Sequence, residues 1–545
     1  MTYLHTLRHL KPVQVYGRLR RHLPRRTPRA EGTWLPRPAL GPWREPIHRA
    51  ASLLGPDRFV FLNQERHLRG AADWNDQATP RLWLYHLHSF DDLNAVHAPR
   101  RKSWHAALIE RWIAENPPGA GAGWEPYPLS RRIVNWIQWA LAGNRLPSRA
   151  VESLAAQAAH LERNVEYHLL GNHLLVNAKA LLFAGVFFTG AAAGRWLSLG
   201  TSILARELDE QILADGAHFE RSPMYHGLVL EDLLDLINVT AAHPGLIDAS
   251  LARDWRRKAQ AMLDWLALMS HPDRRIAFFN DAAFGVAGEP EQLGHYARRL
   301  EIPWQWPGSG ALAGLAASGY FRLSRGETTI LIDAGEIGPD YQPGHAHADT
   351  LSLELSHRGR RLLVNSGTST YEPGVERGRQ RGTPAHNTVA VDGQDQSEVW
   401  ASFRVARRAR PQAVTTEESA AGVMLEAAHD GYTRLPDPVT HRRRVELTAD
   451  GVKITDMLEA AGSHRVEIYF HWHPDLRLLS EGRAIAVDAR EGGELARIEL
   501  DPALEPSLES TTYHPEFGLS LPNTTLRGSW LGRCPVSFVT FLQLP

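Results

Sequence analysis

The sequence predicts an α+β multidomain chain, in which a helical part curled into an α/α toroid or a solenoid precedes an antiparallel β-sandwich. Between about residues 100 and 300, apolar residues recur at three-to-four spacing in seven consecutive segments, which short breaks of Gly, Pro, Asp or Asn separate. Beyond Trp304 the spacing falls to two, in short runs divided by turn signals such as Asp392-Gly and Asp450-Gly. The change of period places the boundary near residues 303 to 315.

The composition indicates a globular protein with no disulfide and no strong overall charge. A chain of 545 residues exceeds one ordinary core, so we expect two or three domains. The 60 Lys and Arg against 61 Asp and Glu give no global field for nucleic acid, which we exclude as a partner. Cys534 is the single cysteine. No stretch approaches about eighteen consecutive apolar residues, so we expect no membrane span; the oligomeric state stays open.

Residues 1–50 are predicted to form a basic arm, a short helix followed by extended chain. Six arginines lie between Arg18 and Arg29, where prolines interrupt the run. No apolar leader follows Met1, so we expect a cytoplasmic location, or a periplasmic or secreted one if the native start is missing. The toroid is placed at residues 51–305, with helices expected over Ser103–Glu115, Ser130–Leu141, Ser148–Leu170, His173–Phe188, Trp196–Ala214, Met224–Ala241 and Ala252–Met269.

The sandwich is placed at residues 306–545 and holds a dense group of chemically active side chains. Strands are expected over Tyr320–Leu323, Thr328–Asp333, Thr350–Ser356, Arg361–Asn365, Asn387–Asp392, Gly422–Ala427, Arg442–Leu447, Val452–Glu459, Arg465–Trp472 and Ser537–Leu542. Just before the third of these, Gly344-His-Ala-His-Ala-Asp brings together His345, His347 and Asp349, which share one face if the alternation continues. One imidazole can then hold a metal while the other transfers a proton, although His-x-His is also a common surface pattern.

Two predicted helix starts carry polar groups that suit binding or catalysis. Asn172 is a natural N-cap, and with His173 it would present an amide, an imidazole and free backbone N–H groups to a carboxylate. A capping Asn beside an incidental His is the alternative. Pro223 suits a first helical turn, which places Tyr225 and His226 where side chains can face the mouth of a toroid. Tyr225 is then either a packed aromatic or a proton carrier whose pKa its neighbours would have to lower.

Further aromatic and charged residues are candidate contacts for a sugar ring and its acid group. They lie around the predicted helix starts and between the predicted strands. Solvated loops with ordinary surface arginines explain several of them equally well. The candidate substrate contacts are Trp124, Glu125, Arg132, His226, Arg377 and Arg381.

A metal site is predicted from side chains that lie far apart in the sequence. His347 and His386, with an oxygen donor from Asn365, would make a nitrogen and oxygen donor set that is typical of zinc. Manganese and calcium are the alternative ions. Asp349 is a nearby carboxylate that can compensate for the uncharged Asn365.

Together these motifs resemble those of the heparinase II/III-like polysaccharide lyases over residues 100–460. The carriers are Asn172-His173, Ser222-Pro-Met-Tyr225-His226, Gly344–Asp349, Leu363-Val-Asn-Ser-Gly-Thr368 and Ala385-His-Asn-Thr-Val389. The resemblance implies an α/α toroid joined to an antiparallel β-sandwich, and β-elimination on a uronic-acid polysaccharide. It further implies that Asn172 and His173 bind the uronate carboxylate. Tyr225 and His345 are implied as the acid and base, in an order left open.

The resemblance also implies a structural divalent metal on His347 and His386, which would fix the loop that presents His345. Where the family commonly has aspartate, this chain has Asn365, and the lost negative charge weakens a zinc site.

We therefore expect a lyase acting on an anionic glycan, either a glycosaminoglycan such as heparan sulfate, hyaluronan or chondroitin sulfate, or an alginate-like polymer. A catalytically silent glycan-binding protein of exopolysaccharide biosynthesis is the alternative from another class. A hydrolase would need a pair of carboxylic acids, and the spacing of Glu125, Asp215 and Glu220 shows no such pair.

Overall fold

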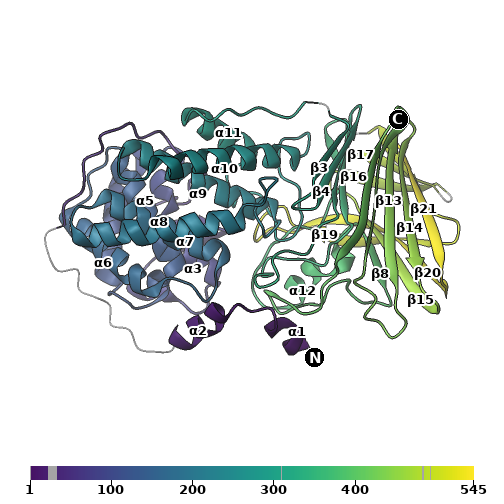
Figure 1. The fold of residues 1–545 in the computed structure, drawn as a ribbon, viewed down its shortest axis with the longest axis horizontal. Helices are drawn as coiled ribbons and strands as arrows, with labels where there is room; N and C mark the ends of the chain where they lie inside the picture. The colour runs from purple at the N-terminus through teal and green to yellow at the C-terminus, as the bar shows by residue number, and fades with distance from the viewer. Residues whose placement is uncertain (1, 22–33, 309, 482–483, 491) are drawn as a thin grey trace.

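A computed structural model describes the chain except residues 1, 22–33, 309, 482–483 and 491. Its helical half and its β half lie side by side along the long axis of the molecule (Figure 1). Helix α11, Pro290–Arg299, is the last of the helical half, and strand β3, Leu312–Leu315, is the first of the β half. The predicted order, an α/α toroid followed by an antiparallel β-sandwich, is confirmed.

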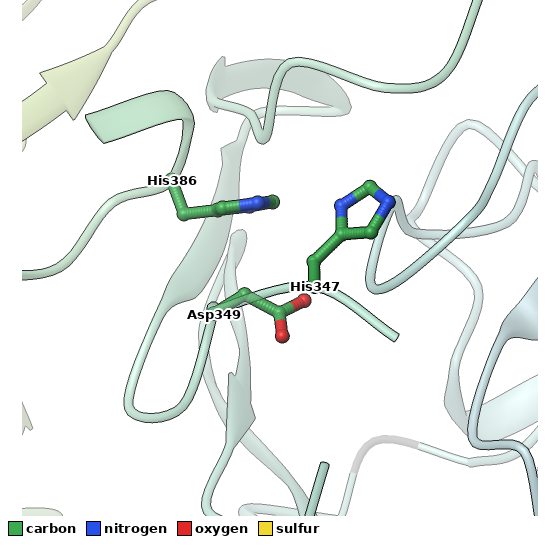
Figure 2. A group of neighbouring side chains, drawn as sticks. All are labelled: His347, Asp349 and His386. Atoms are coloured by element: carbon green, nitrogen blue, oxygen red, sulfur yellow. The ribbon is translucent and has the colours of Figure 1, made fainter. Parts of the chain in front are cut away.

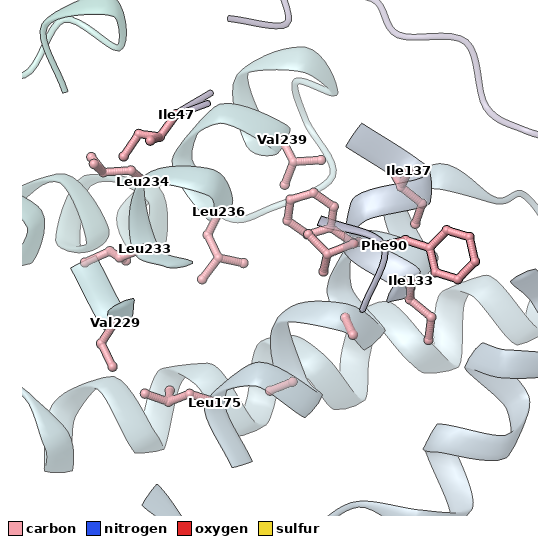
Figure 3. Packing of buried hydrophobic residues seen from close by; sticks show 14 of the residues in the cluster. Ile47, Phe90, Ile133, Ile137, Leu175, Val229, Leu233, Leu234, Leu236 and Val239 are labelled. Carbon is pink, nitrogen blue, oxygen red and sulfur yellow. The ribbon is translucent and has the colours of Figure 1, made fainter. Parts of the chain in front are cut away.

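The helices of the toroid surround a common apolar core. Helix α7 is buried along nearly its whole length and packs against α5, α8 and α9, as its apolar residues on every side require. Figure 3 shows part of this core, with Leu175 of α7 among residues of α5 and α9. The helices are α3 Arg81–Ser89, α4 Lys102–Glu115, α5 Pro126–Leu141, α6 Ser148–Asn164, α7 Gly171–Phe187, α8 Ala191–Gln211, α9 Pro223–Ala242, α10 Ala249–Leu268 and α11.

A buried ion network fixes α7 relative to α9. The Nζ of Lys179 lies 2.7 Å from Oδ1 of Asp232 and 2.6 Å from Oδ2 of Asp235. Burial lowers the pKa of Lys179, but the two carboxylates outweigh it and raise the pKa, so the group stays charged. Both helices carry predicted site residues at their N-terminal ends, and this network holds those ends in register.

The β half consists of antiparallel sheets that share one buried cluster. The first sheet has the order β3-β4-β5-β6-β7, the second β11-β12-β13-β14-β21-β18-β17-β16 and the third β19-β20-β15-β8. The strands after β3 are β4 Tyr320–Arg325, β5 Thr328–Asp333, β6 Leu353–His357, β7 Arg360–Leu363, β8 Val389–Val391, β11 Pro411–Glu418, β12 Gly422–His429, β13 Thr440–Thr448, β14 Gly451–Glu459, β15 Ser463–His471, β16 Leu476–Glu481, β17 Ala484–Ala489, β18 Glu494–Glu499, β19 Glu505–Tyr513, β20 Leu521–Arg533 and β21 Val536–Gln543.

Shorter helices and hairpins complete the fold. Helices α1, Thr2–Leu7, and α2, Pro12–Arg21, run along the lower edge of both halves in Figure 1. Helix α12, Val375–Arg381, precedes β8, and the short pairs β1, Arg58–Phe61, with β2, Gln64–His67, and β9, Val399–Trp400, with β10, Arg404–Val405, are hairpins. Residues 22–33 of the predicted arm, which spans residues 1–50, lie outside the described residues. Among the residues that the structure describes, no helix combines the length and the apolar character that crossing a bilayer requires.

Two local predictions are wrong. The strand expected at Thr350 begins at Leu353, because Leu351 takes a left-handed backbone conformation with φ 63° and the preceding chain forms turns. His345, His347 and Asp349 therefore do not share a strand face. Helix α7 begins at Gly171, so Asn172 lies inside its first turn and is not the N-cap.

Candidate active site

A cavity of about 660 Å³ lies where the toroid meets the sandwich. The toroid contributes Asn172 and His173 from the start of α7 and Tyr225 from the start of α9, while the sandwich contributes His345 and Tyr371 from loops. The four residues predicted to bind the carboxylate and to transfer protons therefore lie together on the wall of one cavity. Residues from the N-terminal helices complete the wall.

Tyr225 is held against two side chains of the sandwich. Its ring is stacked on the imidazole of His345, with centroids 3.7 Å apart and an interplanar angle of 18°. Its hydroxyl lies 2.9 Å from the hydroxyl of Tyr371. The backbone position is set by the helix start, where Pro223 occupies the first turn and Ser222 Oγ accepts from the N–H of Tyr225 at 3.1 Å.

Glu220 orients His345. Its carboxylate accepts a hydrogen bond from Nδ1 of His345, which leaves Nε2 as the nitrogen that carries a lone pair into the cavity. Burial raises the pKa of Glu220, but the neighbouring His345 outweighs it and lowers the pKa below its usual value. Gly171, at φ 56°, makes room for this carboxylate, since a Cβ there would lie 3.0 Å from Glu220 Oε1.

Asn172 and His173 present polar atoms to the same cavity. The side-chain oxygen of Asn172 is buried and accepts no hydrogen bond from the described residues. The NH2 group of the same amide carries the N–H donors that a carboxylate accepts from. His173 Nδ1 lies 3.2 Å from Oε2 of Glu166, and its ring packs on Tyr127 with centroids 4.6 Å apart. Burial lowers the pKa of His173, but Glu166 outweighs it and raises the pKa, which favours a cationic ring.

The pKa of Tyr225 moves in the direction opposite to the one that a base would need. Burial and the adjacent Tyr371 raise it well above its usual value. The neighbours of Tyr225 therefore do not lower its pKa in the unliganded protein. A phenol that keeps its proton can donate it, so this environment suits Tyr225 to act as a general acid.

A second group of side chains, close in sequence to His345, is buried (Figure 2). His347, Asp349 and His386 each offer one atom to a common point, with all these atoms within 4.8 Å of one another. Nδ1 of His347 and Nε2 of His386 have no partner among the described residues. Burial lowers the pKa of His347 to about 4 and that of His386 well below its usual value. Both rings are therefore neutral at pH 7, which is the form that binds a metal ion.

The surroundings of this group point its donor atoms inward. Asp281 accepts from Nε2 of His347 at 2.8 Å, which leaves Nδ1 with its lone pair. Oδ1 of Asn365 lies 3.2 Å from Nδ1 of His386, which likewise leaves Nε2 free. Asn365 therefore sits beside a donor histidine and orients it, while Asp349 supplies the carboxylate. The residues fit a divalent ion with two nitrogen ligands and one oxygen ligand.

The predicted substrate contacts are mostly structural in this fold, and their placement corrects the expectation. Arg132 is completely buried and donates to Gln157 Oε1 at 3.0 Å, His88 O at 3.0 Å and Gly123 O at 2.8 Å. Arg377 is bound to Asp281 and Arg381 to Ala346 O. Arg377 also donates to Ser402 O and Arg381 to Ala401 O, so both support residues of the cavity wall from behind. None of the six predicted contacts belongs to the cavity lining: Trp124, Glu125, Arg132, His226, Arg377 and Arg381.

Each of the other three has its own structural partner. Trp124 donates to Asn116 O at 3.2 Å, and Glu125 precedes α5 and binds Arg81 and Tyr85. His226 is fully buried, with Nε2 2.9 Å from Met262 O. These side chains make their contacts within the toroid, and none of the three belongs to the cavity lining.

Glu220, Asp281 and Tyr371 are the functional neighbours that the sequence interpretation missed. Their partners His345, His347 and Tyr225 lie 66 to 146 residues away in the sequence, so no local sequence pattern predicts these contacts. Glu220 had one signal: it is a carboxylate five residues before Tyr225.

Comparison with known proteins agrees with this architecture. Residues 101–291 match the family description "Heparinase II/III N-terminus", and residues 307–535 match "Heparinase II/III-like, C-terminal". The FtsZ-localized protein C of Caulobacter vibrioides is 26% identical over 449 residues, which are 76% of this chain and 73% of that protein. A heparin-sulfate lyase of Bacteroides stercoris is 27% identical over 309 residues, which are 50% of this chain and 45% of that lyase. The chain thus spans about half the length of that lyase.

A solved structure shares the fold over most of this chain. The crystal structure of heparinase III superposes with a TM-score of 0.68 at 17% identity, covering 85% of this chain and 76% of that chain. Both family descriptions match in order, one on each side of the cavity. This chain belongs to the heparinase II/III-like family.

Proposed function

We propose that this protein is a lyase that cleaves a uronate-containing glycosaminoglycan by β-elimination. The observation that carries the proposal is the stacking of Tyr225 on His345 at 3.7 Å, within a cavity whose wall also holds Asn172 and His173. β-Elimination needs a base at C5, an acid at the glycosidic oxygen and donors for the carboxylate. The cavity supplies Asn172 and His173 for the carboxylate, His345 for the base and Tyr225 for the acid.

The carboxylate of the uronate is assigned to the start of α7. The amide of Asn172 donates to one oxygen, and the ring of His173, whose pKa Glu166 raises, adds positive charge beside it. Neutralising the carboxylate makes the C5 proton acidic enough to remove, because the developing negative charge spreads onto those oxygens.

His345 is assigned as the base and Tyr225 as the acid. Nε2 of His345 takes the C5 proton, the electron pair of that bond forms the C4–C5 double bond, and the bond from C4 to the glycosidic oxygen breaks. The phenol of Tyr225 gives its proton to that oxygen. Glu220 fixes the tautomer that makes Nε2 the acceptor, and the raised pKa of Tyr225 keeps its proton in place until the bond breaks.

A structural divalent ion, with zinc as the first choice, is proposed for the buried group close in sequence to His345. His347, Asp349 and His386 would hold it, and Asn365 orients His386. When bound, the ion supplies positive charge that locks the loop at residues 344–349. His345 belongs to this loop, so its position relative to Tyr225 depends on the anchoring of His347 and Asp349.

For the substrate we propose heparan sulfate ahead of other glycosaminoglycans, since the heparin-sulfate lyase named above supports that class. That relative gives an alginate-like polymer no support. The test is incubation of the purified protein with heparan sulfate, hyaluronan and chondroitin sulfate, with ultraviolet absorbance reporting the unsaturated uronate. Binding without any rise in absorbance would instead favour the catalytically silent glycan-binding protein.

A further inference from the structure

The N-terminal helices supply one face of the cavity wall. Thr6, Leu10, Gln14 and Arg18 recur every four residues, and all of them line the cavity. Gln14 and Arg18 lie four residues apart on α2 and therefore share one face of that helix, while Thr6 belongs to α1 and Leu10 to the link between the two helices. These residues precede the part of the chain that matches the family, which begins at residue 101. The arm is therefore a feature of this chain rather than of the matched family regions.

Specific contacts seat α2 at the cavity. Gln14 Nε2 donates to the backbone oxygen of Tyr341 at 3.1 Å, and Lys11 binds Glu210 while its Nζ lies 3.8 Å from the centre of the Tyr341 ring. Gly17 lets the helix approach the loop before α7, since a Cβ there would lie 3.0 Å from Cβ of His168. With residues 11, 14 and 17 held, Arg18 has little freedom to leave the cavity wall.

Four arginines line the cavity, and they divide into two kinds. Arg81 is bound to Glu125, and Arg408 is bound to Asp340. Arg18 and Arg404, both half-buried, have no carboxylate partner within the described part of the chain. Burial lowers the pKa of Arg404, and the nearby charge of Arg18 lowers it further.

Arg18 and Arg404 line the same cavity, and their like charges repel each other; an anion bound between them would relieve that repulsion. Guanidinium groups bind sulfate and carboxylate through paired N–H donors. The carboxylate of the reacting uronate is already assigned to Asn172 and His173, so an anion at the arginines belongs to another sugar or to another substituent.

We propose that Arg18 and Arg404 form an anion subsite that binds a sulfate or carboxylate group of the glycan at a sugar other than the one that loses its C5 proton. The subsite rests on the proposed function for the identity of its ligand. It makes the N-terminal arm part of the substrate-binding surface, together with β10, which carries Arg404.

The test is equilibrium binding, which needs no turnover. Heparan sulfate hexasaccharide labelled with a fluorophore is titrated with full-length protein carrying Tyr225→Phe, to which Arg18→Ala, Arg404→Ala or both are added. Each single change should weaken binding roughly tenfold, the effect of one charge-assisted hydrogen bond. Because both arginines bind the same anion, the double change should cost much less than the product of the two single changes. Arg18→Lys, which keeps the charge, should lose less than Arg18→Ala.

The control is Arg477→Ala, an exposed arginine of β16 outside the cavity, which should leave binding unchanged. Desulfated and carboxyl-reduced hexasaccharides identify the anion: the probe that lacks it should bind weakly and should no longer respond to Arg18→Ala. The proposal is overturned if both alanine variants bind every probe within twofold of the Arg477→Ala protein. It is also overturned if Arg18→Ala weakens all probes alike, since the arm would then act only through packing. Failure of elimination by the wild-type protein would affect the proposed function and leave this binding result standing.

Discussion

The imidazole of His345 lies flat against the phenol ring of Tyr225, with centroids 3.7 Å apart and planes inclined by 18°. The two residues come from different halves of the chain, so the pair exists only when the toroid and the sandwich are docked. Tyr225 is fixed by a helix start, whereas His345 depends on a loop whose next residues reach the buried His347, Asp349 and His386 group. Docking of the two halves and anchoring of that loop are therefore requirements for activity.

Glu220→Gln should lower kcat on the order of a hundredfold or more while leaving KM nearly unchanged. Glutamine can donate to Nδ1 of His345, and this would place the proton on Nε2, the atom that must accept one. Steady-state elimination kinetics measure the effect. Glu162→Gln on α6, whose carboxylate pairs with Arg195, serves as the control and should behave as wild type. An equal loss in both variants would remove Glu220 from the mechanism.

Tyr371→Phe should reduce kcat by roughly tenfold, the value of one hydrogen bond to a polar partner. The Tyr371 hydroxyl lies 2.9 Å from that of Tyr225 and positions the acid, but it transfers no proton to the substrate in our assignment. The pH profile of kcat separates the roles. An abolished reaction in Tyr371→Phe, with a folded protein, would mean that Tyr371 and not Tyr225 donates the proton.

Asn365→Asp should raise the affinity for a divalent ion, because it adds a negative charge beside His386 without changing the size of the side chain. Elemental analysis of wild-type, Asn365→Asp and His386→Ala proteins after dialysis against zinc measures this directly. We expect the metal content to rise in the first variant and to fall in the second. Equal metal content in all three proteins would contradict the site.

Arg132→Ala should act on stability rather than on substrate binding. Its guanidinium is completely buried and holds Gln157, His88 O and Gly123 O, so its removal leaves buried acceptors without donors. We expect a loss of about 3 kcal/mol or more in the free energy of unfolding of the toroid, seen as a lower urea midpoint. KM of the folded protein should stay at the wild-type value. Arg149→Ala, whose side chain is 67% exposed, should change neither.

Asp456 should make the sandwich sensitive to acid. Burial raises the pKa of Asp456, but Arg443 and His441 outweigh it and hold the pKa at about 2, below the usual value of 3.8. The unfolded chain therefore binds this proton first, so the stabilisation is complete above about pH 4 and is lost as the pH falls through about 2. The difference in urea midpoint between wild type and Asp456→Asn should be large at pH 7 and should shrink towards pH 2. A difference that does not vary with pH would contradict this assignment.

Regular elements with strong local signals were predicted well. β5 spans the predicted Thr328–Asp333, and α9 begins at Pro223, one residue before the predicted start, because a proline and a capping serine mark that turn. The loop before β6 was misread as strand because alternation continues in the sequence, while the positive φ of Leu351 depends on tertiary packing. The predicted role of Arg132 as a substrate contact was not confirmed for a similar reason. The sequence alone does not show whether its guanidinium faces a cavity or three buried carbonyl oxygens.

The site itself was only half visible in the sequence. Asn172, His173, Tyr225 and His345 stand in recognisable local motifs and line the same cavity. Glu220, Asp281 and Tyr371 reach their partners only when the toroid and the sandwich meet. Contacts between residues so far apart in sequence produce no repeating pattern from which they could be predicted.

The central claim is elimination by the Tyr225 and His345 pair, and the most direct measurement is ultraviolet absorbance of the unsaturated uronate during incubation with heparan sulfate. We predict a steady rise with the wild-type protein, and no rise with Tyr225→Phe or His345→Ala proteins that retain the wild-type circular dichroism spectrum and melting curve. A rise at the wild-type rate in either variant would contradict the assignment of that residue. A flat trace from the folded wild-type protein on heparan sulfate, hyaluronan and chondroitin sulfate would contradict the proposed activity.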